Sequence, residues 1–502
     1  MSTNDPKPTA ASLTNRDSGR PEEAQDEFGS LTAPYDAAVF REQARTVVDL
    51  LAAYLSAADG GELPVVPLPS PDALMSEWPG VLESRRAFPD LIADVVAQSS
   101  HQHHRGYLGQ QVTAPLPLTA LTSMCAALLN NSSAIYEGAP VTTVMERRVI
   151  RWMADEVGYG AAADGVLTSG GSLGNLTAML AARQARAPWD VWQEGVRGGP
   201  PLAVLVSEES HYTVERAAVI MGLGQCSVRQ VPVDDSYRTS RSGLRAAYER
   251  AESEGYHVIA AVGNACSTAT GIYDDLEMMG EFCAERGVWF HVDAAHGAPA
   301  LLSPRHTRLL RGIELADSVI WDAHKMMLIP SVCTGVIFRR GADSARTFRQ
   351  QADYLVGTSD WAEFSLAERT LECTKNMMAL NVYVALAVLG RDYFRRYVEY
   401  TFDLAGWFAD ELERRPTFQV AVAPQSNIVC FRYVAGSGLD RDALQRTLRD
   451  RLLEGGQFFI TRTQLGGKTY LRVVIINPLT RRKELLALID ELEHLGEVVA
   501  AD

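Results

Sequence analysis

Residues 288–327 read VWFHVDAAHGAPALLSPRHTRLLRGIELADSVIWDAHKMM and contain two short apolar runs that each end in polar residues. The runs 288–293 and 317–322 are almost continuously apolar, which is typical of strands buried on both faces of a sheet. Asp293 closes the first run, and His324 and Lys325 follow the second in a short loop. Because ligands bind beyond the carboxyl ends of strands in open parallel sheets, we expect these three side chains at a ligand site.

The surrounding sequence repeats this alternation of strand and helix. PLAVLVS at 201–207 and HVIAAVG at 257–263 also predict buried strands, and helical stretches such as TVERAAVIMGLG and DLEMMGEFCAERG lie between the runs. The alternation predicts an α/β fold, with a mostly parallel central sheet covered by helices on both faces. After about residue 375, long helical segments, four strand-like runs and two further helices predict a smaller C-terminal α+β domain.

The N-terminal part of the chain has a different character. Residues 1–33 are rich in Ser, Thr, Asn, Asp and Pro, and we interpret them as a disordered tail. Residues 34–100 predict an amphipathic helical segment for dimerisation, since its apolar stripe must be buried on a neighbouring subunit or, alternatively, on the main body. We therefore expect a large ligand-binding domain at 101–375 and the small domain at 376–502.

Composition and charge narrow the class of protein. The 502 residues are 47% hydrophobic and 22% charged, as in soluble globular proteins, and the formal net charge of -15 argues against a nucleic-acid binder. The seven cysteines form no CxxC pair, so we expect neither a zinc site nor a disulfide framework. The start of the sequence lacks the apolar core of a signal peptide, and no stretch is apolar enough to span a bilayer. We expect a cytoplasmic protein that does not bind membranes.

Lys325 and Asp293 together indicate a particular chemistry. A lysine in a loop after a strand can form an imine with an aldehyde cofactor, although a lone lysine there is more often an exposed surface residue. A carboxylate at a neighbouring strand end keeps the pyridine nitrogen of pyridoxal 5'-phosphate (PLP) protonated, so that the ring withdraws electrons from a substrate carbanion. A single Asp at that place is otherwise commonly a cap of the following turn or helix.

Two further segments fit the same cofactor. GVLTSGGSLGNLTAMLAARQ, residues 165–184, runs from a strand through Gly171 and Ser172 into a helix, and backbone N–H groups at a helix start bind phosphate. In SEESHYTVERAAVIMG, His211 follows a strand and can stack on a flat ring. Each signal alone is weak, since glycine pairs before helices and histidines after strands are mostly structural.

In this order, the glycine-serine turn, the SEESHYTVER segment, HVDAA and the HK pair resemble the group II PLP-dependent amino acid decarboxylases. These include the aromatic amino acid, glutamate, cysteine sulfinate and diaminobutyrate enzymes. The resemblance covers roughly residues 36–500. It implies the fold type I (aspartate aminotransferase-like) architecture and a homodimer with active sites at the subunit interface.

The resemblance also implies roles for the central residues. Lys325 would hold PLP as a Schiff base, and His324 beside it would contact the cofactor. Asp293 would pair with the pyridine nitrogen. His211 would stack on one face of the ring, and Ala295 would close the other face.

It implies roles for the periphery of the site as well. Gly171 and Ser172 would bind the phosphate, and Thr268 in GNACSTATGIYDD would lie near the cofactor. Arg472 in TYLRVVIINP would bind the α-carboxylate of the substrate, since a guanidinium fits a carboxylate bidentately. Gln110 in HHRGYLGQ would lie near the substrate side chain. No metal ligand is implied.

Several residues depart from the family pattern. Asp322 replaces a common Asn, and we assign it no phosphate contact because a carboxylate repels phosphate. Cys266 replaces a usual glycine, and Lys375 stands where an arginine is common. Phe364 takes the place of a loop tyrosine that protonates the substrate carbon, while Tyr354 belongs to an earlier part of the loop and is out of position.

Three functions follow as alternatives. The first is decarboxylation of an L-amino acid to the amine and CO2, with an acidic or small polar side chain favoured because WDAHKMMLIPSVCTG is closer to the glutamate and cysteine sulfinate branch. The second is decarboxylation-coupled oxidative deamination to an aldehyde, or another PLP carbanion reaction, and Phe364 is its support. The third, a catalytically silent scaffold, is disfavoured by the intact Lys325 and Asp293.

Overall fold

The computed structural model describes residues 31–82, 86–345, 347–348, 361, 364–435 and 440–501. The predicted tail at 1–33 lies almost wholly outside these residues. Contacts within the chain divide it into two units, of which the first comprises Met1–Ser56 and Pro69–Gln98, and the second Ala57–Leu68 and Ser99–Asp502.

The first unit is helical over its described residues. It contains most of α2 (Ala37–Gly60), together with α3 (Pro71–Glu77) and α4 (Phe88–Gln98). The hydroxyl of Ser70 caps α3 by accepting a hydrogen bond from the Ala73 N–H, and Trp78 Nε1 donates to Gln98 Oε1 at 2.7 Å. Apolar side chains of α2, among them Val39, Phe40 and Val48, are exposed.

The second unit is built on a seven-stranded sheet of order β1-β7-β6-β5-β4-β2-β3. Its strands are β1 (Asp164–Thr168), β2 (Leu202–Ser207), β3 (Val228–Val231), β4 (His257–Asn264), β5 (Trp289–Asp293), β6 (Ser318–Asp322) and β7 (Thr334–Phe338). β6, β5, β4, β2 and β3 pair in parallel, and β7 lies antiparallel to both β1 and β6. The predicted mostly parallel sheet is therefore confirmed.

The inner strands, such as β2 and β5, are apolar on both sides because both faces of the sheet are covered. Trp289 and Val204 face a core that includes α7 (Gly171–Arg186) and α9 (Thr213–Ile220). Phe290 and Leu205, one position further along each strand, face the opposite core. That core includes residues of α6 (Pro140–Val157), α10 (Arg241–Ser253) and α11 (Leu276–Arg286). Alternation of successive side chains across the sheet accounts for both assignments.

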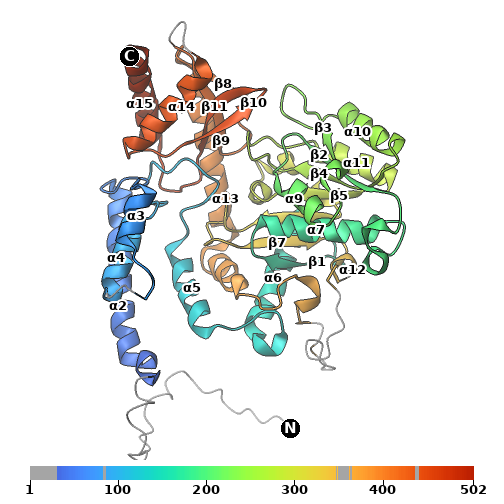
Figure 1. Cartoon of the computed structure of the whole chain (residues 1–502), viewed down its shortest axis with the longest axis horizontal. Helices are drawn as coiled ribbons and strands as arrows, with labels where there is room; N and C mark the ends of the chain where they lie inside the picture. Colours follow the sequence, from blue (N-terminus) through green and yellow to red (C-terminus); the bar gives the residue numbers. More distant parts are fainter. Residues whose placement is uncertain are drawn as a thin grey trace, which may run out of the picture. The chain divides into compact units, whose positions relative to one another are not determined.

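The C-terminal part of the second unit has its own sheet and core. Its four antiparallel strands have the order β10-β11-β9-β8, with bounds Thr461–Leu465, Lys468–Val474, Ile428–Tyr433 and Phe418–Val420. α14 (Arg441–Glu454) and α15 (Arg482–Ala501) pack on it, and Phe431, Leu448 and Leu471 lie in its core. α13 (Met378–Glu413), coloured orange in Figure 1, contributes residues to this core and to the central one.

The remaining α-helices of the described second unit are α5 (Pro117–Leu129), α8 (Val191–Glu194) and α12 (Gly341–Ala345). Among the helices in the described part of the chain, none combines the length and the apolar character needed to cross a membrane. The contacts keep 101–375 and 376–502 in one unit, so the division between them stays a prediction.

Candidate active site

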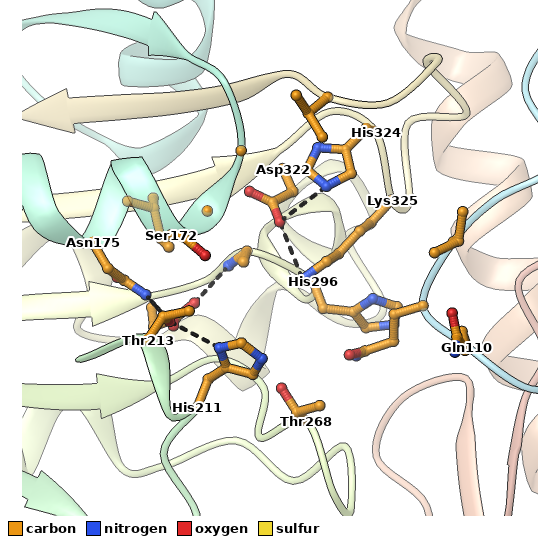
Figure 2. A pocket seen from close by; sticks show the side chains of 18 of the residues that line it. Gln110, Ser172, Asn175, His211, Thr213, Thr268, His296, Asp322, His324 and Lys325 are labelled. Atoms are coloured by element: carbon orange, nitrogen blue, oxygen red, sulfur yellow. Dashed lines mark hydrogen bonds and ion pairs between the residues drawn. The ribbon is translucent and has the colours of Figure 1, made fainter. Parts of the chain in front are cut away.

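A cavity of about 630 Å³ lies where the central strands end. Its lining includes all ten residues for which the sequence predicts a cofactor or substrate role, namely Gln110, Gly171, Ser172, His211, Thr268, Asp293, Ala295, His324, Lys325 and Arg472. They come from seven segments between residues 110 and 472. Figure 2 shows how several of these side chains converge.

Asp293 is the last residue of β5, and a chain of buried hydrogen bonds fixes its carboxylate. Asn175 Nδ2, on α7, donates to Asp293 Oδ2 at 3.0 Å and to Thr213 Oγ1 at 2.9 Å. Because its amide nitrogen is used in this way, Asn175 Oδ1 accepts from His291 Nε2, which lies 2.9 Å away. The carboxylate thus faces the cavity in one orientation.

The chain continues into the core on the far side of His291. His291 Nδ1 lies 2.8 Å from Ser318 Oγ, which in turn accepts from Trp289 Nε1 at 2.9 Å. Burial lowers the pKa of His291 to about 4, so its ring is neutral at physiological pH. Asn175, His291 and Ser318 were missed by the sequence reasoning. The available signal was position: His291 precedes Asp293 by two residues on one strand and therefore shares its face.

Lys325 is held at the end of β6 by Asp322. The distance from Lys325 Nζ to Asp322 Oδ2 is 3.1 Å, and the Asp322 side chain is only 2% exposed. Burial alone would lower the pKa of Lys325, but the carboxylates of Asp322 and Asp293 raise it above its usual value. His324 Nε2 lies 3.6 Å from the same Asp322 oxygen.

His211 lies on the side of β2 and α9. Its Nδ1 is 2.8 Å from Thr213 Oγ1. The same hydroxyl oxygen accepts from Asn175 Nδ2, which links His211 to the hydrogen bonds around Asp293. Burial lowers the pKa of His211, and the nearby Asp293 opposes this effect. Ala295, which is 8% exposed, also lines the cavity and leaves room for a flat group.

The start of α7 provides a seat for an anion. Gly170 has φ +99°, a conformation that favours glycine, and the helix begins directly after it at Gly171. The first N–H groups of a helix have no partner inside the helix, and its dipole favours negative charge there. Gly171 and Ser172 line the cavity at this point. A phosphate fits such a seat.

Arg472, on β11, is a buried cation without a carboxylate partner among the described ion pairs. The side chain donates to backbone carbonyls instead: Nη2 to Thr268 at 2.6 Å, Nε to Ala269 at 3.1 Å and Nη1 to Gly109 at 3.3 Å. Burial lowers its pKa. These contacts orient the guanidinium and leave its charge available to an anionic ligand in the cavity.

The positions that depart from the family pattern fall into two groups. Asp322 and Cys266 line the cavity, and burial raises the pKa of the Cys266 thiol to about 12, so it stays protonated. Phe364 is not a lining residue: its ring pairs with that of Tyr136 at 5.6 Å and lies below the Arg147 guanidinium. Lys375 is also away from the lining, in an ion pair with Glu146. Tyr354 lies outside the described residues.

The sequence of this chain is similar to those of known decarboxylases. The model of the pyridoxal-dependent decarboxylase conserved domain matches residues 85–434. Cysteine sulfinic acid decarboxylase of Mus musculus is 30% identical over 83% of this chain and 87% of its own length. Acidic amino acid decarboxylase GADL1 of the same species is 27% identical, covering 82% of this chain and 78% of its own.

Solved structures agree with the sequence relatives. The crystal structure of mouse CSAD superimposes with a TM-score of 0.87 at 27% identity, covering 92% of this chain and 99% of that one. The fold class expected from the sequence is thereby confirmed. The chain belongs to the pyridoxal-dependent decarboxylase family and is an enzyme that uses PLP to decarboxylate an amino acid.

Proposed function

We propose that the chain decarboxylates an L-amino acid with an acidic or small polar side chain, using the ten cavity residues in the roles given above. The observation that carries the proposal is that one cavity combines a lysine amine, an oriented carboxylate and a helix start with a buried arginine that lacks an acidic partner among the described ion pairs. Asp293 and Lys325 fit the ring nitrogen and the aldehyde of PLP, and the start of α7 fits its phosphate.

Lys325 and Asp293 have separate roles toward the cofactor. When bound, PLP supplies an aldehyde that links to amines and a ring that draws electrons from the bond to the departing carboxylate. Lys325 would hold the cofactor through its side-chain amine. Asp293 keeps a proton on the ring nitrogen, and the hydrogen bond from Asn175 maintains its orientation.

The other side chains position the substrate. Arg472 orients the α-carboxylate, because its guanidinium is already held by three backbone carbonyls. His211 stacks on one ring face and Ala295 closes the other, while Thr268 and His324 complete the cofactor contacts. The amides of Gln110 and Gln111 line the substrate end of the cavity and offer hydrogen bonds to a polar side chain.

The preference for an acidic substrate is supported by the relatives, which are named for cysteine sulfinic acid and for acidic amino acids. The test is a product analysis. The purified enzyme with PLP is incubated aerobically with L-cysteine sulfinate, L-aspartate, L-glutamate, L-2,4-diaminobutyrate and L-tryptophan, while amine, aldehyde, CO2 and hydrogen peroxide are followed together. We expect equal amounts of amine and CO2 from an acidic substrate, without peroxide. Turnover of L-tryptophan alone would contradict the substrate class.

Aldehyde with an equal amount of peroxide would instead support oxidative deamination. The sequence basis for that alternative is Phe364, whose ring lies against Tyr136 and Arg147 rather than in the cavity of its own chain. A Phe364→Tyr variant in the same assay tests it. We expect the ratio of amine to aldehyde to stay unchanged.

We further propose that the chain is a cytoplasmic homodimer. Leu121, Met124, Leu128 and Leu129 of α5 are between 43% and 66% exposed, which leaves an apolar helix face for a second copy to cover. The seven cysteines are all unpaired, as is usual in a reducing compartment. Sedimentation of the purified chain tests the dimer, with Leu128→Glu expected to dissociate it and Leu68→Glu, another exposed leucine, as the control. Fractionation of the native cells tests the compartment.

A further inference from the structure

The carboxylate of Asp322 has protein donors on both of its oxygens. Thr334 Oγ1 donates to Oδ1 at 2.5 Å, and Lys325 Nζ lies 3.1 Å from Oδ2. The backbone N–H of Asp322 donates to the Ala295 carbonyl at 3.1 Å, which fixes the end of β6. Figure 2 shows the carboxylate between the lysine and His324. Contacts to both carboxylate oxygens and to the backbone N–H therefore set the position of Asp322.

The same carboxylate lies next to the anion seat. A Cβ atom on Gly171, the first residue of α7, would be 3.3 Å from each of the two Asp322 oxygens. A buried carboxylate beside a phosphate is unfavourable unless a cation accompanies it. Lys325 is such a cation whenever its amine is free, because an opposite charge at this distance favours the ammonium form.

Building on the proposed role of Lys325, we propose that Asp322 is a positioning residue that keeps the freed Lys325 amine protonated and in place beside the anion seat. Held in this way as an ammonium, the free Lys325 amine would not compete with the substrate amine for the cofactor.

Several other ionisable groups lie around Lys325. Those that interact with it electrostatically or are adjacent to it are Asp293, His211, Cys266, His296 and His324. Asp293 is the other carboxylate, but its oxygens accept from Asn175 and from the Ala295 N–H, and its charge serves the ring nitrogen. Burial lowers the pKa of His296 to about 3, so it is neutral. Asp322 is the carboxylate whose contact with the lysine is direct.

The test uses the full-length chain and measures how fast it captures PLP. Cofactor is removed, PLP is added back, and the rise of the visible absorbance band is followed from pH 6 to pH 10. Capture requires the neutral amine, so the midpoint of the rate profile reports the pKa of Lys325. In Asp322→Asn we expect the midpoint to fall by about one unit or more, and capture at pH 7 to be roughly tenfold faster.

Two control variants isolate the contact. Thr334→Val removes the hydrogen bond to the other oxygen and leaves the lysine contact, so we expect a midpoint within about 0.3 units of the parent, well below a direct charge effect. Asp343→Asn removes a carboxylate paired with Arg340, outside the cavity lining, and should change nothing. An unchanged or higher midpoint in Asp322→Asn would overturn the proposal.

A second measurement needs no variant. Competitive labelling of amines in the cofactor-free parent chain, read by mass spectrometry across pH, gives the midpoint of Lys325 beside that of the exposed Lys468. We expect Lys325 to titrate above Lys468, and the reverse order would refute the proposal. If borohydride treatment of the holoenzyme fails to fix PLP on Lys325, the proposed function fails instead, independently of these midpoints.

Discussion

The ammonium of Lys375 lies 2.5 Å from Glu146 Oε2, and the two side chains are 0% and 1% exposed. Glu146 Oε1 also accepts a hydrogen bond from the Leu167 N–H at 2.8 Å, on the strand that leads into the anion seat. Ser169, which follows that strand, contacts the carboxylate of Glu372. The segment around Lys375 is thus tied to the strand that precedes the cofactor site.

This buried pair predicts a large loss of stability when one partner is removed. Lys375→Met leaves the Glu146 carboxylate buried without its cation, which typically costs about 3–5 kcal/mol. We expect urea unfolding to show a loss of that size for Lys375→Met. Lys468→Met, at an exposed lysine, is the control and should stay close to the parent. Equal urea midpoints for Lys375→Met and Lys468→Met would mean that the Lys375–Glu146 pair contributes nothing to the stability of the fold.

Lys325→Ala should remove the covalent attachment of PLP. Borohydride reduction followed by peptide mass spectrometry is expected to find PLP on Lys325 in the parent and on no lysine in the variant. CO2 release should fall to background. Lys483→Ala changes an exposed lysine and should keep both the label and the activity.

Asp293→Asn should retain the cofactor but lose activity. The amide keeps the shape of the side chain but not the charge that holds a proton on the ring nitrogen. We expect kcat to fall roughly 10²–10³-fold, the size seen when one preorganised electrostatic group is lost. Spectroscopic titration with PLP would check that binding persists. A kcat within threefold of the parent would argue that Asp293 has no part in the chemistry.

Arg472→Lys should weaken substrate binding even though the substitution keeps the positive charge. A lysine cannot reproduce the planar fork that three carbonyls now orient, so one charged hydrogen bond to the substrate is lost, worth about 1.5–3 kcal/mol. KM should rise roughly 10- to 100-fold. Arg462→Lys, on the neighbouring strand and exposed, is the matched control. The idea is wrong if both variants have the same KM.

The raised pKa of the buried Glu209 carboxyl leads us to expect that the stability of the fold depends on pH. Burial, with Glu208 and Asp274 nearby, raises the pKa of its carboxyl from an ordinary 4.5 to about 7, and Oε2 has no hydrogen-bond partner in the described chain. The folded protein therefore holds this proton more tightly than the unfolded chain, so the contribution to stability falls as pH rises from 4.5 to 7. Glu209→Gln should raise Tm at pH 8 and leave it nearly unchanged at pH 4.

The control for this change is Glu285→Gln, at an exposed glutamate whose substitution should have no pH-dependent effect. Thermal melts of both variants across this range provide the comparison. A Tm gain for Glu209→Gln that is equal at both pH values would contradict the argument.

By itself, the sequence determined the class of fold and ten of the residues that line the cavity. Long apolar runs with helical patterns between them predict strands buried on both faces, because only that arrangement hides so many large side chains. They are present as β2, β4, β5 and β6. The polar residues that end them meet at one edge because parallel strands end together. β3 and β7 were not predicted, since β3 is short and half polar and β7 is a five-residue run that contains a glycine.

Only the tertiary structure decided which partners these residues have. Two of these contacts join separate elements: Asn175 with Asp293, and Lys375 with Glu146. The third, between Asp322 and Lys325, depends on how the end of β6 turns into its loop. Alternation along a strand gives the face of a residue but not the neighbour across the sheet, because the order of the strands is set by packing of the whole domain. The sequence could therefore indicate Lys325 and Asp293, while the charges and hydrogen bonds that act on them required the fold.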